Sequence, residues 1–529
     1  MGNLVALAVH GDAFLHRRET GTILVDGGGS SSALAAQLVK QVPVLDRLDV
    51  VVCTHADLDH ANGLKNILTS WRAVSNKPVS IGEFWLPGRW MEIAKSGLTD
   101  PKALTSSVIR ALDSGDLDIA RALFWAEGAD ADEAERDDEQ GHKPSISAKQ
   151  LGRALGHPAV VVRFVGEGAS CRLDVDIASS RTEGQEVPAP TYVKPSGRLD
   201  GAGKDQVGDR IEVTLRMGPG SKGMGDRDLR GVHEMLSTMV RGERQAADGA
   251  APEERQGQVD IATEPYEPDW ARTMRQAQET PSGPEDAAHA FSNARRRVIY
   301  RMGQHRHLIE RGLPVSVGTS VAMGRYCLAL IDAAEAIVEI ARHAMQEDVP
   351  IRWFDYDAFA KQRTASGGRS QFLLPMNAVE LRSPPIAQLP SVVFYLALSK
   401  ANRESLVFYA PAETGCRGVV FCGDSRLGYG WGGRQPFHPY ASMKASLQVG
   451  TAPHHAAESA DLAYVHAPLF GIDRWVCAAN GRTTPGPGYR AIAQAARCCT
   501  ACPLIAKPLA SVAIDLDLSR FALPACKCS

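Results

Sequence analysis

The sequence predicts an α/β protein in which two β-rich halves flank a looser middle. Short apolar runs separated by tight turns recur between residues 3 and 90 and again after residue 350, while 321–345 is a long apolar stretch of helical pattern. Strand patterns mixed with helix patterns are typical of layered α/β folds. Residues 180–290 are rich in Gly, Pro, Ser, Gln and charge, which is typical of loops or insertions. The halves are thus either separate domains or one layered fold with a long insertion.

The expected elements follow in chain order. Each early apolar run ends in Gly, Asp or His, which is where sites are usually built. A helical pattern begins near residue 91 and gives way to an acidic run, which we interpret as a solvated linker. We expect strands at 4–10, 21–26, 49–54, 210–217, 351–354, 392–398, 406–409 and 418–422, and helices at 228–240 and 321–345.

Composition excludes several classes of protein. The chain has 529 residues, with 58 Lys and Arg against 61 Asp and Glu, a formal charge of −3, and is 44% hydrophobic. These values exclude a strongly basic nucleic-acid coat and a wholly disordered chain, but a local basic groove fits within a neutral total. The N-terminus lacks the pattern of a secretory signal and no apolar run is long enough for a membrane span, so we expect a cytoplasmic protein with no membrane partner.

The strongest chemical signal is Thr54-His55-Ala56-Asp57-Leu58-Asp59-His60, directly after the apolar run Val50-Val51-Val52-Cys53. Two imidazoles and two carboxylates within six positions at a strand end suit a pair of divalent ions roughly 3.5 to 4 Å apart. Helix capping would explain one aspartate but not the whole set.

The second half supplies further metal-binding residues at strand ends. The apolar run 419–422 ends in Gly423-Asp424, and the run before Pro453 ends in His454-His455. Taken singly, each pattern is more typical of a turn. Together with the first motif they form a ligand set.

These motifs, in this order, resemble the metallo-β-lactamase fold. The order is Val25-Asp26-Gly27-Gly28-Gly29, then His55-x-Asp57-x-Asp59-His60, then Gly423-Asp424, then Pro453-His454-His455. More narrowly, the chain is similar to the branch found in the hydrolase domain of the DNA-uptake protein ComEC. In that branch an aspartate stands in place of the second histidine of the usual HxHxDH motif. Residues 402–408 also resemble the Asn-x-x-Ser-Leu-Val element of that branch. The resemblance covers roughly residues 1–90 and 370–495.

The resemblance implies a fold and a domain plan. The fold is an αββα sandwich, two mixed β-sheets flanked by helices, carrying a large insertion that is partly helical and partly irregular. We expect the first half at 1–90, the insertion at 91–310, the second half at 311–495 and a Cys-rich tail at 496–529.

The resemblance also implies roles for the motif residues. His55 and Asp57 would hold one metal, Asp59 and His60 the other, and Asp424 would bridge them; His454 would complete the second site while His455 faces the substrate. Asp26 would lie beneath the metals and orient a ligand. We therefore expect two divalent ions, Zn²⁺ or Mn²⁺, with Asp59, His455 and Asp26 taking part in catalysis.

One histidine of the family pattern is missing. The fold usually has another histidine between the first motif and the bridging aspartate, but only Asn377 stands where this branch would place it. The His55/Asp57 ion is therefore held weakly, completed by water, or absent.

Three functions follow from these residues. The first is a metal-dependent phosphodiesterase or nuclease acting on nucleic acid or a nucleotide; the second is a hydrolase of a small ester or lactone on the same metals. The third is a scaffold or regulatory protein with a degraded metal site, which binds a protein partner through residues 91–310. Candidate phosphate contacts are Arg426, Arg434, Lys444 and Arg482.

Five of the eleven cysteines lie within the last 32 residues. Cys499 and Cys502 form a CxxC pair, and Cys526 and Cys528 form a CxC pair. Four thiolates paired in this way can close a tetrahedral structural zinc site. Free or redox-labile thiols and a disulfide are the alternatives.

Overall fold

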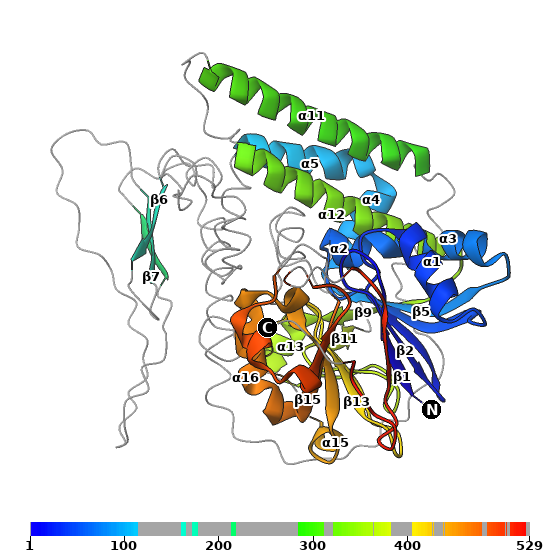
Figure 1. Ribbon diagram of the computed structural model, residues 1–529. Helices are drawn as coiled ribbons and strands as arrows, with labels where there is room; N and C mark the ends of the chain where they lie inside the picture. The colour runs from blue at the N-terminus through cyan, green and yellow to red at the C-terminus, as the bar shows by residue number, and fades with distance from the viewer. Residues whose placement is uncertain are drawn as a thin grey trace, which may run out of the picture.

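Two β-sheets face each other, and helices cover the outer face of each, as the computed structural model shows (Figure 1). This arrangement confirms the predicted αββα architecture. The structure describes residues 2–114, 160–165, 172–177, 213–217, 284–310, 321–362, 364–381, 405–425, 427, 437, 440–478, 484–502, 504 and 508–524.

The first sheet has eight strands in the order β11-β9-β5-β4-β3-β2-β1-β17. Strands β3, β4, β5 and β9 run parallel, and the pairs at the two ends are antiparallel. The sheet is therefore mixed. Its strands are β1 (Asn3–Ala6), β2 (Phe14–Arg18), β3 (Gly21–Val25), β4 (Arg47–Val52), β5 (Ser80–Pro87), β9 (Ile351–Asp355), β11 (Val379–Leu381) and β17 (Val512–Asp515).

The second sheet has six strands in the order β10-β12-β13-β14-β15-β16, and it too is mixed. Its strands are β10 (Leu374–Pro375), β12 (Phe408–Ala410), β13 (Gly418–Phe421), β14 (Gln448–Thr451), β15 (Ile472–Cys477) and β16 (Arg497–Cys499). A separate three-stranded sheet comprises β6 (Val160–Val165), β7 (Arg172–Ile177) and β8 (Val213–Met217).

The helices divide between the two outer faces. Over the first sheet lie α1 (Ser31–Gln41), α2 (Leu58–Ala61), α3 (Ile67–Ser75), α4 (Trp90–Thr99), α5 (Pro101–Ser114), α11 (Pro284–Glu310) and α12 (Val321–Gln346), and Figure 1 shows α11, α5 and α12 stacked side by side. Over the second sheet lie α15 (Ala441–Lys444), α16 (Asp461–His466) and α17 (Pro487–Ala491). A further helix, α13 (Tyr356–Gln362), follows β9. None of the helices in the described ranges has the length and hydropathy needed to cross a bilayer.

Strand β4 shows why the central strands read as continuous apolar runs. Val50 and Val52 face the second sheet, where they pack in one core with Phe408 and Phe421. Val51 faces the helices and packs in the other core. Successive side chains of a strand point to opposite faces, so a strand covered on both sides must be apolar at every position.

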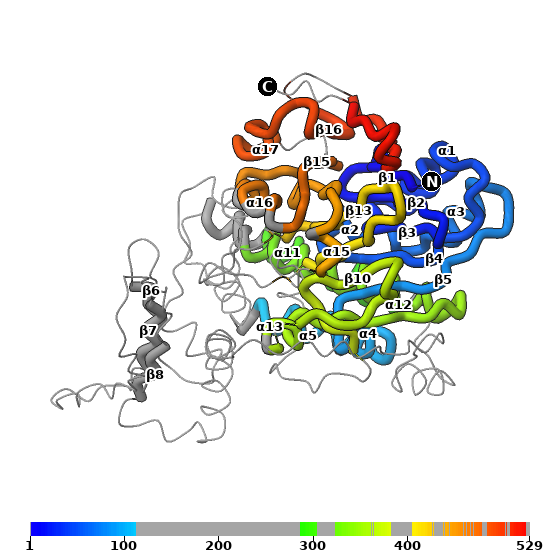
Figure 2. Tube along the Cα trace, turned by 90° about the horizontal axis from the view of Figure 1, so that it is seen from below, coloured from blue at the N-terminus to red at the C-terminus, as the bar shows by residue number. Residues whose placement is uncertain are grey.

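Packing does not follow the expected domain limits. Helices α4, α5 and α11 lie in the expected insertion, yet their apolar faces join the core beneath the first sheet. Strand β9 extends β5, so the chain completes the first sheet before it builds most of the second. The chain ends in a similar way, because β17 pairs with β1, and Figure 2 shows this red C-terminal segment beside the blue N-terminal strands.

His16 on β2 predicts a pH dependence of stability. Its side chain is buried, Nδ1 lies 3.0 Å from the carbonyl oxygen of Asn3, and burial, reinforced by the charge of Arg18, lowers its pKa to about 3. Below about pH 6.5 the unfolded chain binds a proton that the folded protein excludes, so stability falls as pH decreases from 6.5 towards 3. We expect the protein to lose about 2 kcal/mol more than a His16→Leu variant between pH 7 and pH 5. Denaturant unfolding at both pH values measures this, and equal losses would contradict it.

Candidate metal centre

The loop after β4 brings its two histidines together. The chain leaves the sheet at Cys53 and turns into the single-turn helix α2, so that the rings of His55 and His60 lie 4.2 Å apart. Both side chains are buried. Asp57 occupies the N-cap position of α2 but makes no side-chain capping bond. Capping therefore does not account for this aspartate, and its Oδ2 lies 3.6 Å from His55 Nε2.

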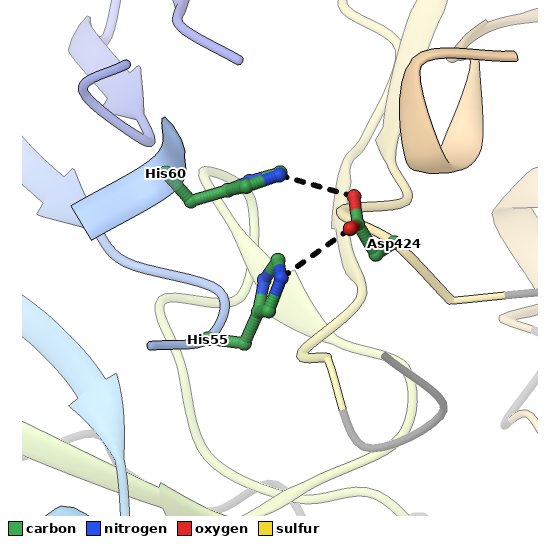
Figure 3. A group of neighbouring side chains, drawn as sticks. All are labelled: His55, His60 and Asp424. Atoms are coloured by element: carbon green, nitrogen blue, oxygen red, sulfur yellow. Dashed lines mark ion pairs between the residues drawn. The ribbon is translucent and has the colours of Figure 1, made fainter. Parts of the chain in front are cut away.

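Asp424 reaches this pair from the other sheet. It follows β13, where Gly423 adopts a φ of 50°, and its backbone N–H donates to Ser405 Oγ at 3.0 Å. Asp424 Oδ1 lies 3.1 Å from His60 Nε2, and Oδ2 lies 3.4 Å from His55 Nε2. Figure 3 shows both rings pointing at the two oxygens of this one carboxylate.

The histidine pair after β14 lies on a turn of unusual conformation, the 3₁₀ segment η4 (Pro453–Ala456). His454, His455 and Ala456 all have φ values between 49° and 63°, a region that residues other than glycine seldom adopt. Backbone conformations of this kind cluster at functional sites, where surrounding contacts maintain them. The turn separates the two rings and gives them different surroundings.

His455, rather than His454, joins the other candidate ligands. His455 Nε2 lies 2.8 Å from Asp59 Oδ2, and these atoms form a group with His60 Nε2 in which all lie within 4.8 Å of one another. His454 Nε2 lies 4.0 Å from Asp424 Oδ2, and its side chain is 16% exposed against 4% for His455. The sequence favoured His454 as the ligand, whereas this geometry favours His455.

Asp26 contacts two residues of the first motif, Thr54 and His60. Its carboxylate accepts hydrogen bonds from the backbone N–H of Thr54 at 2.8 Å and from Thr54 Oγ1 at 2.8 Å, and its Oδ2 lies 2.9 Å from His60 Nδ1. Because Nδ1 donates to this carboxylate, Nε2 is the His60 nitrogen left to bind a metal ion, and it faces Asp424.

The centre brings buried imidazole nitrogens and carboxylate oxygens together. His55 Nε2, His60 Nε2 and Asp424 Oδ1 are buried and have no hydrogen-bond partner within the described part of the chain. Burial raises the pKa of Asp424, but the charges of His60 and His55 outweigh this effect and hold it well below its usual range. A buried carboxylate facing two imidazole nitrogens needs a cation. His55, His60 and Asp424 form one group that could hold a metal ion, and Asp59, His60 and His455 form a second.

Asn377, which stands where the sequence resemblance would place another histidine, has a structural role. Its Nδ2 donates to the carbonyl oxygen of Ser405 at 2.9 Å, and its Oδ1 accepts from the backbone N–H of Val407 at 2.8 Å. The Ser405 hydroxyl lies 3.4 Å from His55 Nδ1. Asn377 therefore holds the segment that supports His55.

We expect Asn377→Ala to destabilise the protein by about 2–4 kcal/mol, because it leaves the buried N–H of Val407 and the buried carbonyl of Ser405 without these hydrogen bonds. Asn62→Ala is a matched control, since that side chain donates one bond, 2.8 Å to Gly29 O, and is only half-buried. Denaturant unfolding of both variants measures the difference. A loss for Asn377→Ala no larger than that for Asn62→Ala would contradict the prediction.

Several predicted residues lie outside the described ranges. Cys499 and Cys502 are buried, but Cys526 and Cys528 lie outside the described residues. The structural zinc site therefore stays a prediction. Of the candidate phosphate contacts, Arg426, Arg434, Arg482 and the side chain of Lys444 also lie outside them.

Asp12 was not predicted as a residue of the centre. This carboxylate is 1% exposed, and its Oδ1 lies 2.8 Å from His455 Nδ1. Burial raises its pKa, against the opposing charge of His455. The available signal was the Gly11-Asp12 pair that interrupts the first apolar run. A turn after one strand does not reveal which distant loop will pack against it.

Comparison with known proteins agrees with the fold and the centre. The chain has no match among curated proteins. Members of the metallo-β-lactamase superfamily are generally hydrolases, and their fold typically binds divalent metals. The Metallo-beta-lactamase superfamily model matches residues 7–168, and the two mixed sheets flanked by helices are consistent with that fold.

Proposed function

We propose that the protein is a phosphodiesterase or nuclease that uses two divalent ions held between the sheets. The observation that carries this proposal is the Asp424 carboxylate, whose two oxygens each face a buried imidazole nitrogen, at 3.1 and 3.4 Å. A carboxylate that faces two such nitrogens at once is suited to bridge two cations.

The contacts support one assignment of the candidate ligands to the two ions. His55, Asp57 and Asp424 Oδ2 would hold the first ion. His60, Asp59, His455 and Asp424 Oδ1 would hold the second. The missing histidine leaves the first ion with fewer protein ligands, so we expect it to bind more weakly.

The charge of the centre favours two ions over one. Five aspartates, Asp12, Asp26, Asp57, Asp59 and Asp424, surround it, and only the Asp59 side chain is more than slightly exposed. Buried carboxylates need compensating charge. Two divalent ions supply four positive charges while the histidines stay neutral as ligands. The carboxylate-rich set leans towards Mn²⁺ more than an all-histidine site would, with Zn²⁺ as the other candidate.

Divalent ions bound here would activate water as a nucleophile near neutral pH and neutralise the charge of a phosphoryl group. The side chains of the chain position these ions. Asp26 fixes the ring of His60, and Ser405 connects the backbone of Asp424 to the His55 ring. His454, the more exposed histidine of its pair, is the candidate for substrate contact in place of His455.

A phosphodiester is the substrate class we favour. Its support is the sequence resemblance to the ComEC-type branch, together with a centre that concentrates positive charge once it is loaded with metal. A family resemblance is an argument by analogy, because one fold serves many chemistries. The substrate must therefore be tested directly.

The test incubates the full chain with Mn²⁺ or Zn²⁺ and with single-stranded DNA, double-stranded DNA, RNA, cyclic nucleotides and a carboxylic ester panel. We expect metal-dependent cleavage of at least one phosphodiester, and no cleavage by an Asp59→Ala, His60→Ala double variant. Ester cleavage alone would overturn the substrate class. The absence of both metal binding and cleavage would instead favour the scaffold hypothesis.

A further inference from the structure

Asp12 lies at the tip of the hairpin between β1 and β2, outside the ligand set described above. Both of its carboxylate oxygens are buried, and neither has a well-aligned hydrogen-bond donor among the described residues. Its Oδ1 nevertheless lies 2.8 Å from His455 Nδ1. Burying a carboxylate without hydrogen-bond donors costs free energy, so its contact with His455 calls for an explanation.

The surroundings of His455 determine its tautomer. Nδ1 faces two acceptors, Asp12 Oδ1 at 2.8 Å and the carbonyl oxygen of Ala478 at 3.0 Å. A nitrogen between two acceptors carries the proton. Nε2 then keeps its lone pair, and this is the nitrogen that lies 2.8 Å from Asp59 Oδ2.

The backbone of Asp12 is tied to the same centre. Its N–H donates to the carbonyl oxygen of Asp59 at 2.9 Å, and its own carbonyl accepts from the N–H of Gly28 at 2.8 Å. Gly11 makes this approach possible, because its φ is +100° and a Cβ there would lie 2.0 Å from the Asp59 oxygen. The hairpin tip therefore fixes the position of the carboxylate against the Asp59 loop.

We propose that Asp12 is a positioning residue that holds His455, as a ligand of the second ion, in the correct tautomer and orientation. The inference rests on the proposed function. Two histidines of the centre are then held in the same way: the Asp26 carboxylate contacts Nδ1 of His60, and the Asp12 carboxylate contacts Nδ1 of His455. Asp12 comes from the first sheet and His455 from a loop of the second, so this contact also aligns the two sheets at the centre.

The test measures metal affinity on the full chain by titrating Mn²⁺ against a competing chelator. We expect the wild type to bind two ions, and Asp12→Asn to weaken one of them about 10-fold because an amide oxygen still lies beside Nδ1 but carries no charge. Asp12→Ala should weaken the same ion by up to about 100-fold. Asp49→Asn is the control, because that half-buried carboxylate accepts from the N–H of Thr22 at 2.8 Å and belongs to neither ligand group.

A double-mutant cycle separates positioning from a general structural role. In a His455→Gln background, Asp12→Asn should cause no further loss of Mn²⁺ affinity, because the ring that it orients is gone. Metal-free unfolding of each variant establishes that it is folded. Additive losses, or an Asp12→Asn affinity equal to that of the wild type, would overturn this inference alone. A wild type that binds no ion would overturn the proposed function as well.

Discussion

Replacing Asp424 with asparagine is expected to abolish metal-dependent hydrolysis, with a fall in kcat/KM of about 10³-fold or more. Asp424 is the residue whose two oxygens face both His55 and His60, so under the proposed function its loss would remove a ligand of each ion. Metal ions contribute several kcal/mol of transition-state charge stabilisation, and each 1.36 kcal/mol corresponds to a factor of ten in rate. A neutral amide with one acceptor oxygen cannot replace a bridging carboxylate.

The measurement compares Asp424→Asn with Asp473→Asn on whichever phosphodiester the wild type cleaves. Asp473 pairs with Arg417 on the second sheet and lies outside both ligand groups, so its loss should leave kcat/KM nearly unchanged. Metal content after dialysis should fall in the first variant and stay constant in the second. If Asp424→Asn kept wild-type activity, the assignment of Asp424 as the bridging ligand would be wrong.

Removing the metal is expected to destabilise the protein, and the effect should grow as pH rises. At a concentration 100 times its Kd, one bound ion stabilises the folded state by about 2.7 kcal/mol, which raises the unfolding temperature of a protein of this size by about 2–4 °C. In the metal-free protein, burial and His60 oppose protonation of His55, but Asp424 and Asp57 outweigh them and raise its pKa to about 9.

The sign of the pH dependence follows from that shift. A folded pKa above the unfolded value of 6.5 stabilises the metal-free protein fully below pH 6.5, and this contribution is lost as pH rises through 9. Metal binding requires deprotonated ligands and therefore strengthens over the same range. Calorimetric melts with and without chelator at pH 6.5 and 8.5 should show the larger difference at pH 8.5. Chelation should leave Asp424→Asn unchanged, and a wild type insensitive to chelation at pH 8.5 would refute the prediction.

Much of the centre was predictable because its parts are local in sequence. The motif from His55 to His60 follows one apolar strand, and Asp424 follows another. Strand ends in layered α/β folds project their loops to an edge where ligand sites form. Asp26 was predictable for the same reason, since it directly follows β3.

The choice between His454 and His455 was not predictable from spacing. Adjacent residues on an ordinary strand or helix have regular side-chain directions, but both histidines have positive φ values in the structure. Their directions depend on how η4 packs against the rest of the chain. The contact between His455 and Asp59 joins residues 396 positions apart.

The sequence by itself determined the fold class and the strand-end motifs, because apolar runs and their terminal residues are local patterns. Only the tertiary structure decided that β9 and β17 complete the first sheet, that Asn377 supports a loop, and that Asp12 meets His455. These outcomes depend on which distant segments pack together. Packing of this kind is set by the shape and burial of the whole core, which no single segment encodes.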